Sequence, residues 1–63
     1  MTVTIRDALV KVKTQKAILV DVDGEDYWIP LSQVDEESEV FEKGDQGDLI
    51  ITEWIAQQKG LTP

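Results

Sequence analysis

The sequence predicts a small α+β protein, mainly β, in which a curled antiparallel sheet or barrel of four or five strands precedes one short C-terminal helix. Three observations predict this fold: alternating apolar residues near the N-terminus, an Asp23-Gly24 turn between two apolar stretches, and helix-boundary residues at Thr52 and Gly60. The 63 residues form a single predicted domain, 1–63, near the lower size limit for folding without disulfides. Cysteine is absent, so neither disulfides nor thiolate metal sites are expected.

Residues 2–12 predict the first strand. Val3 and Ile5 share one phase of the alternation, whereas the apolar residues from Ala8 to Val12 have the other phase. A period-2 pattern cannot change phase without moving its side chains to the other face of the sheet. We therefore expect a β-bulge or a break at Arg6-Asp7.

Asp23-Gly24 predicts a hairpin, because this dipeptide supplies positive φ at both central positions of a type I′ turn. A two-residue loop would pair Val22 with Glu25, and a four-residue loop would pair Val22 with Tyr27. Both registers place the same side chains on the same face, so the hairpin is predicted while its register stays open.

The two faces of this hairpin are both apolar. Leu19 and Trp28 lie on the face opposite Val20 and Ile29, so one of the two faces must find cover. We expect the C-terminal helix to cover Trp28 through Trp54 and Ile55, which would place both tryptophans in the core. The alternative is that Trp28 marks an interface with a second copy or with another protein.

The remaining elements follow from local signals. Pro30 ends the strand or lies on a sheet edge, and Leu31–Val34 is expected to form a helical turn or an irregular link. We expect a solvated loop at Asp35–Ser38 and the last strand at Asp48–Ile51. Between them, Val40-Phe41 is a short apolar segment that can anchor the loop to the core.

The C-terminal helix has clear predicted limits. Thr52 is a suitable N-cap for Glu53–Lys59, and the charges at the two ends of this segment favour the helix dipole. Gly60 can adopt the left-handed conformation that ends a helix, and Leu61 can fold back on it. This order of elements fits an SH3-like or an OB-like barrel and does not decide between them.

Charge is distributed unevenly along the chain. Residues 21–48 hold eleven carboxylates and one basic residue, Lys43, for a formal charge of −10, whereas the first sixteen residues carry +3. An acidic body of this kind repels nucleic acid and anionic membranes and attracts basic protein surfaces. The expected partner is therefore a protein with a basic surface. The predicted protein-binding residues are Asp21, Asp23, Glu25, Asp26, Trp28, Asp35, Glu36, Glu37, Glu39 and Glu42.

The sequence does not predict an enzyme. Histidine is absent, no glycine loop for phosphate is present, and Ser32 and Ser38 have no activating base at motif spacing. Asp21–Asp26 fails the EF-hand pattern because position 6 is Asp26 rather than glycine, and position 12 is Ser32 rather than glutamate. No cofactor and no metal are expected. In the two-residue register Asp21 would face Asp26, a like-charge pair that a basic group or a weakly held cation would relieve.

The segments Lys16–Val20, Trp28–Val34, Gly44–Gly47 and Glu53–Ala56, with a closing Lys59–Leu61, resemble a group of very short bacteriophage and prophage proteins. The most specific element is Trp28-Ile29-Pro30 followed by Ser32-Gln33. The resemblance implies a mobile-element origin and action in the cytoplasm of a bacterial host. A charge-mimic inhibitor of a host defence protein, such as a nuclease, is one expected form of that action.

An alternative hypothesis is a small OB- or SH3-like accessory protein that binds single-stranded nucleic acid by stacking. Lys11 and Lys13 are expected on one side of the first strand, facing away from Val10 and Val12. With net charge −7, such binding would be confined to one face and sensitive to salt. The residues of this alternative are Arg6, Lys11, Lys13, Lys16, Tyr27 and Trp28.

Overall fold

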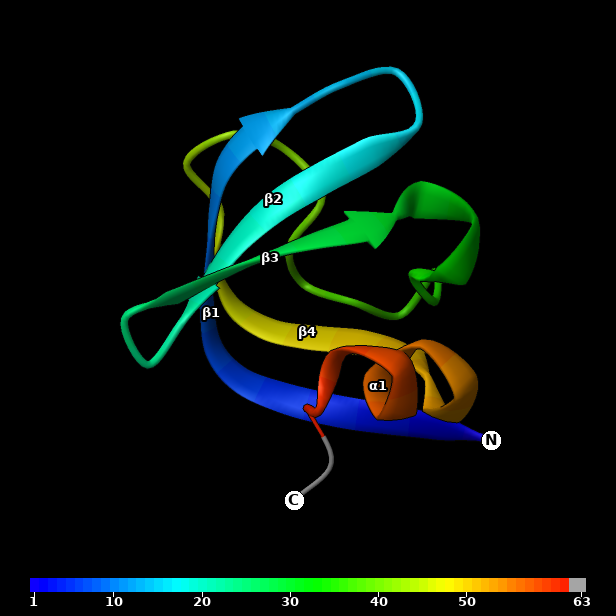
Figure 1. Ribbon diagram of the computed structural model, residues 1–63. Helices are drawn as coiled ribbons and strands as arrows, with labels where there is room; N and C mark the ends of the chain where they lie inside the picture. Colours follow the sequence, from blue (N-terminus) through cyan, green and yellow to red (C-terminus); the bar gives the residue numbers. More distant parts are fainter. Residues whose placement is uncertain (62–63) are drawn as a thin grey trace.

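A computed structural model describes residues 1–61 and shows one curved, open, four-stranded antiparallel sheet with a short C-terminal helix (Figure 1). The strand order is β3-β2-β1-β4, so β3 and β4 are the two edge strands. The elements are β1 Thr2–Lys13, β2 Ala17–Val22, β3 Glu25–Pro30, the 3₁₀ turn η1 Leu31–Gln33, β4 Gln46–Thr52 and α1 Glu53–Lys59. This confirms the predicted fold class in its open form, because the sheet curls without closing into a barrel.

β1 is shared by both halves of the sheet. Its N-terminal part pairs mainly with β4 and its C-terminal part with β2. The pairing with β4 shifts register between Ile5 and Ala8, and Asp7 has a φ of 61°. The predicted bulge at Arg6-Asp7 is confirmed, and it lets one strand bend around the interior.

A second bulge in β1 was not predicted. The register against β2 shifts between Val10 and Val12, so Lys11 is an additional residue on that strand. After the shift Lys13 pairs with Ile18, a buried residue, while Val12 is 39% exposed on the outer face. The prediction that Lys11 and Lys13 share one side of the strand is therefore wrong, since the bulge places them on opposite sides.

The hairpin between β2 and β3 adopts the two-residue register, in which Val22 pairs with Glu25. Asp23 and Gly24 have φ values of 54° and 84°, as a type I′ turn requires.

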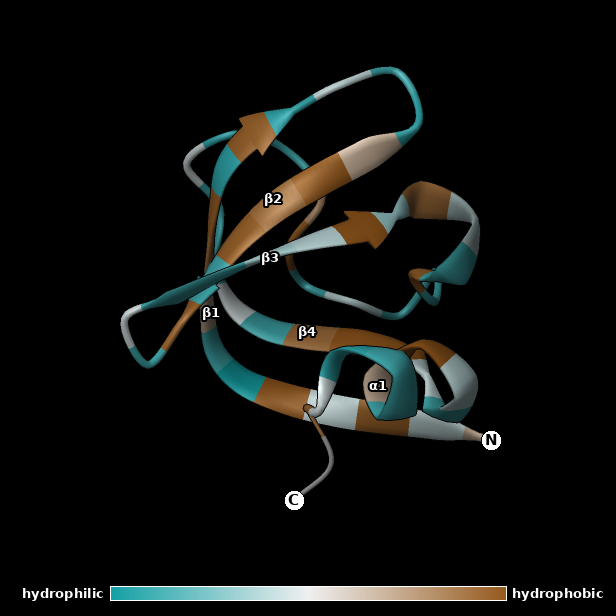
Figure 2. Cartoon of the chain, in the orientation of Figure 1, coloured by the Kyte–Doolittle hydropathy of each residue, from teal (hydrophilic) through white to brown (hydrophobic). Residues whose placement is uncertain are grey.

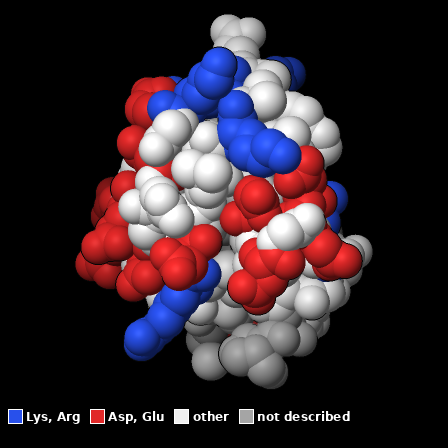
Figure 3. All heavy atoms as spheres, turned by 90° about the vertical axis from the view of Figure 1, so that its left-hand side faces the viewer, with Lys and Arg blue, Asp and Glu red and all other residues white. Residues whose placement is uncertain are grey.

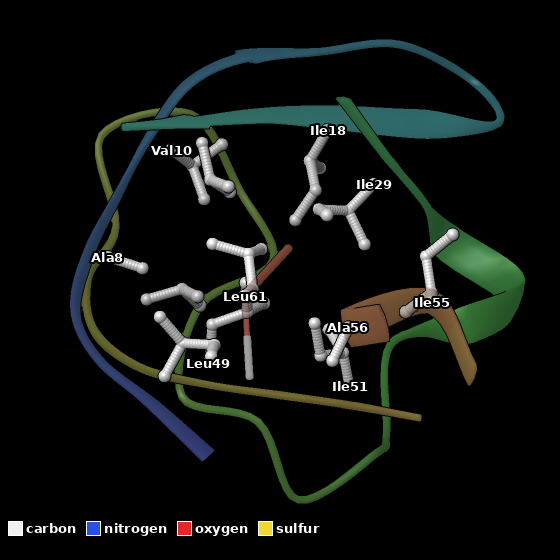
Figure 4. Close-up of a cluster of buried hydrophobic side chains, with 12 residues drawn as sticks. Ala8, Val10, Ile18, Ile29, Leu49, Ile51, Ile55, Ala56 and Leu61 are labelled. Carbon is white, nitrogen blue, oxygen red and sulfur yellow. The ribbon is translucent and has the colours of Figure 1, made fainter. Parts of the chain in front are cut away.

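The hydrophobic core lies on the inner, concave side of the sheet. Figure 2 shows apolar and polar residues alternating along the N-terminal half of β1. Figure 4 shows buried side chains from the strands and from α1 pointing toward one another. The buried apolar residues are Ile5, Ala8, Val10, Ile18, Val20, Ile29, Val40, Leu49, Ile51, Ile55, Ala56 and Leu61.

The helix α1 covers the inner side through Ile55 and Ala56. The Thr52 hydroxyl accepts a hydrogen bond from the Ile55 N–H at 3.3 Å, and Gly60 has the left-handed φ of 71°, so both predicted helix limits are confirmed. No helix among residues 1–61 is long and apolar enough to cross a membrane.

The prediction that both tryptophans lie in the core is wrong. Trp28 is 45% exposed and Trp54 is 60% exposed. Strand alternation sends Trp28 to the outer face while the helix packs on the inner face, where Ile29 lies. The side chain that follows Trp54 in the helix, Ile55, takes the buried position instead.

The segment between η1 and β4 covers the outer edge of β4. Val34 forms a bridge with Ile51, and the Asp35 N–H donates to the Ile50 carbonyl at 2.8 Å. Ser38 was expected in a solvated loop but is only 6% exposed. Its hydroxyl oxygen accepts from the Ile50 N–H at 3.2 Å, which gives this edge amide a partner.

Replacing Ser38 with alanine should destabilise the protein by about 1–3 kcal/mol, because the partly buried Ile50 amide would lose its acceptor. The matched control is Ser32→Ala, at an exposed position, for which a change within about 0.5 kcal/mol is expected. Urea denaturation of the three proteins measures both values. Equal midpoints for Ser38→Ala and the unmodified protein would show that the hydroxyl does not hold this edge.

Candidate functional site

Three apolar side chains form a row across the outer face of the sheet. Val12 of β1 pairs with Leu19 of β2, which pairs with Trp28 of β3. We call these three residues the outer row. Val12 and Trp28 are 39% and 45% exposed, and Leu19 between them is partly buried. The outer row is thus an apolar strip that no described element covers.

Carboxylates border the outer row at its hairpin end. Asp21 and Asp26 lie directly opposite each other, two positions along the strands from Leu19 and Trp28. The like-charge pair expected from the two-residue register therefore exists. Lys11 relieves it, since its ammonium lies 3.1 Å from an Asp26 oxygen.

The other carboxylate of this pair is held by the turn. An Asp21 oxygen accepts a hydrogen bond from the Gly24 N–H at 2.9 Å. Asp23 and Glu25 are exposed at the tip of the same hairpin. We call Asp21, Asp23, Glu25 and Asp26 the hairpin acids. They lie together at the hairpin end of the sheet, and Asp26 is on the same face as Trp28.

Four of the five remaining predicted acidic residues form a second group, along the opposite edge of the sheet. Asp35 accepts from the Glu37 N–H at 2.9 Å, and Glu39 accepts from the Asp48 N–H at 2.9 Å. We call Asp35, Glu36, Glu37 and Glu39 the loop acids. They follow the outer side of β4, so β4 and β1 lie between them and the hairpin acids on β2 and β3. The two groups are near in sequence but flank opposite edges.

Figure 3 views the molecule from the left-hand side of Figure 1 and shows two broad acidic areas with uncharged atoms between them. Basic atoms lie mainly toward the upper end of this view. This face of the molecule is therefore divided rather than uniformly acidic.

Glu42 and Asp45 have local structural contacts. Glu42 binds the Lys13 ammonium at 2.7 Å, which ties the loop before β4 to the end of β1. Asp45 accepts from the N–H groups of Glu42 and Phe41 at 2.9 and 3.1 Å. These two hydrogen bonds, in that order, lower the pKa of Asp45 below its ordinary value of 3.8, with a smaller contribution from Lys13.

The residues of the nucleic-acid alternative are dispersed. Tyr27 and Trp28 are adjacent in β3 and face opposite sides of the sheet, so they form no joint stacking surface. The Tyr27 hydroxyl donates to Glu25 at 2.8 Å, and this hydrogen bond is the main cause of the raised pKa of Tyr27. Lys11 and Lys13 are each paired with a carboxylate, and Arg6 and Lys16 are exposed.

A shallow depression of about 560 Å³ lies between the bulge of β1 and the hairpin tip. Arg6, Asp7, Glu25 and Tyr27 are among its lining residues. Among residues 1–61 no group of three metal-binding side chains is found. The hairpin acids are therefore not arranged as a cation site.

Two residues of the outer row were missed by reasoning from sequence. Leu19 was placed on the same face as Trp28 but was not proposed as a binding residue. Val12 was placed on the same side as Val10, because the bulge at Lys11 leaves no mark in the apolar alternation. Comparison with family models, curated proteins and solved structures gives no match.

The Asp45 carboxyl group should titrate with a midpoint below 3.8, measured by the NMR shift of its carboxyl carbon. Because the pKa is lower in the folded than in the unfolded protein, the stabilisation by Asp45 is complete above pH 3.8 and is lost as the pH falls through the folded value. The stability difference between the unmodified protein and Asp45→Asn should therefore shrink under acid. A midpoint at or above 3.8 would contradict the two backbone hydrogen bonds.

Proposed function

We propose that this protein is a non-catalytic binding factor that docks on a basic surface of another protein. The observation that carries the proposal is the exposed outer row, with Trp28 at its end, beside the hairpin acids. A tryptophan next to uncovered apolar side chains and a charged border is typical of the centre of a protein interface.

The charge of the molecule supports a basic partner. The net charge is −7, and two of the hairpin acids, Asp21 and Asp26, lie on the same face as the outer row, next to Leu19 and Trp28. Complementary charge speeds association and sets orientation, while the apolar contact supplies most of the affinity. A nucleic-acid-binding groove is the basic surface that such an acidic protein fits best, where it would act as a charge mimic.

The resemblance to short phage and prophage proteins favours a host protein in the bacterial cytoplasm as the partner. Inhibition of a host defence protein is the form of action we propose. No catalytic step and no cofactor enter this proposal, and the partner supplies any chemistry.

The test is affinity capture from a bacterial lysate with four immobilised proteins: the unmodified chain, Trp28→Ala, Trp54→Ala and a triple variant with Glu36, Glu37 and Glu39 changed to glutamine. Trp28→Ala should reduce capture more than about tenfold, since truncating a central interface residue costs about 2 kcal/mol or more. Trp54 is 60% exposed on the helix and is the matched control, whose loss should leave capture unchanged.

The triple variant distinguishes the effect of charges near Trp28 from the effect of the net charge. It removes three charges of the loop acids, which lie along the sheet edge opposite Trp28. The triple variant should capture the same protein, in a modestly smaller amount at low salt. Circular dichroism should show that all variants stay folded, since no buried side chain is removed. Equal capture by Trp28→Ala and the unmodified chain would contradict the proposed surface.

A further inference from the structure

The two edges of the sheet differ in a way that suggests how a partner binds. β4 is covered along its outer side by residues 34–39, through the Val34 bridge and the backbone hydrogen bonds of Asp35 and Glu39. β3, at the other edge, pairs only with β2 among the described residues. One edge is therefore protected by the chain itself and the other is open.

The backbone groups at the open edge can be assigned from the register. The Leu31 N–H donates to the Lys16 carbonyl at 2.8 Å, which makes these two residues a hydrogen-bonded pair. Such pairs alternate along an antiparallel ladder, so Tyr27 and Ile29 bond to β2. The N–H and C=O groups of Asp26 and Trp28 then point outward, and no described residue bonds them.

We propose that the β3 edge binds an extended basic segment of the partner protein by antiparallel strand addition. This inference rests on the proposed function and names its binding mode. An added strand would bond the outward groups of Asp26 and Trp28, as edge strands do in other peptide-binding proteins. Pro30 ends the open edge because it has no N–H, so the site is about four residues long.

The side chains beside this edge define the chemistry of the occupant. Asp26 and Trp28 both face the outer side, where residues of an added strand would lie opposite them. A basic residue fits both positions, since arginine pairs with a carboxylate and stacks on an indole ring. The existing pair of Asp26 with Lys11 is exposed and weak enough to be shared.

A second copy of this chain is a poor occupant. Antiparallel pairing of two β3 strands would bring Glu25 and Asp26 of both copies to the same edge, and each chain has a net charge of −7. Two surfaces that both carry high negative charge repel each other in any register of this pairing. Charge complementarity therefore selects a basic segment.

The test uses three blocked hexapeptides in which arginine and valine alternate: one unmodified, one N-methylated at every arginine and one N-methylated at every valine. In antiparallel addition the residues on the outer face donate their N–H groups to β3. Methylation at arginine should therefore weaken binding about tenfold or more, and methylation at valine should have little effect. NMR shifts of the Asp26 and Trp28 amides, followed over millimolar peptide, report binding at the edge.

A glutamate–valine peptide is the charge control and should not bind. Equal binding by the arginine-methylated and the valine-methylated peptides would overturn strand addition, as would the absence of shifts at Asp26 and Trp28 with the unmodified peptide. Capture that depends on Trp28, together with either of these results, would leave the proposed function standing and remove only its binding mode. If capture does not depend on Trp28 and the peptides also fail these tests, the proposed function is contradicted as well.

Discussion

The fold depends on one strand, β1, being hydrogen-bonded on both sides while it bends. Its N-terminal part belongs with β4 and its C-terminal part with β2, so a chain of 63 residues forms a curved sheet without a second sheet to pack against. The bulge at Asp7 makes the bend, and a small domain has little apolar surface to spare for any other arrangement. Aspartate tolerates the left-handed conformation better than most residues, which accounts for a non-glycine residue at this position.

This bend fixes where the remaining apolar groups lie. The interior is filled by the concave face, by α1 and by Val40 of the long loop, and all three contribute fully buried side chains. No element among residues 1–61 covers the convex face, so Val12 and Trp28 of the outer row remain exposed, with Leu19 partly buried between them. Residues 34–39 cover β4 rather than β3. The uncovered edge is therefore β3, the strand that carries Glu25 and Asp26 of the hairpin acids. The candidate binding surface is a direct consequence of how a short chain completes its core.

Local signals in the sequence predicted much of the fold. The Asp23-Gly24 turn, the bulge at Arg6-Asp7 and the limits of α1 each depend on a few neighbouring residues, and all are confirmed. The burial of Trp28 was predicted wrongly because it depends on which face the helix covers, and alternation leaves that choice open. Ser38 looked solvated because its partner, the Ile50 amide, is distant in sequence. The acidic residues appeared as one group for the same reason, since closeness along the chain does not show which sheet edge each residue follows.

Residue-specific amide hydrogen exchange of the free protein tests the central claim that one edge is closed and the other open. The account predicts that the amides of Tyr27 and Ile29, bonded to β2, exchange about a thousandfold more slowly than those of Asp26 and Trp28. The Ile50 amide, which donates to Ser38 on the covered edge, should be slow as well. Protection of the Trp28 amide equal to that of Ile29 would contradict the account, because the β3 edge would then already be paired.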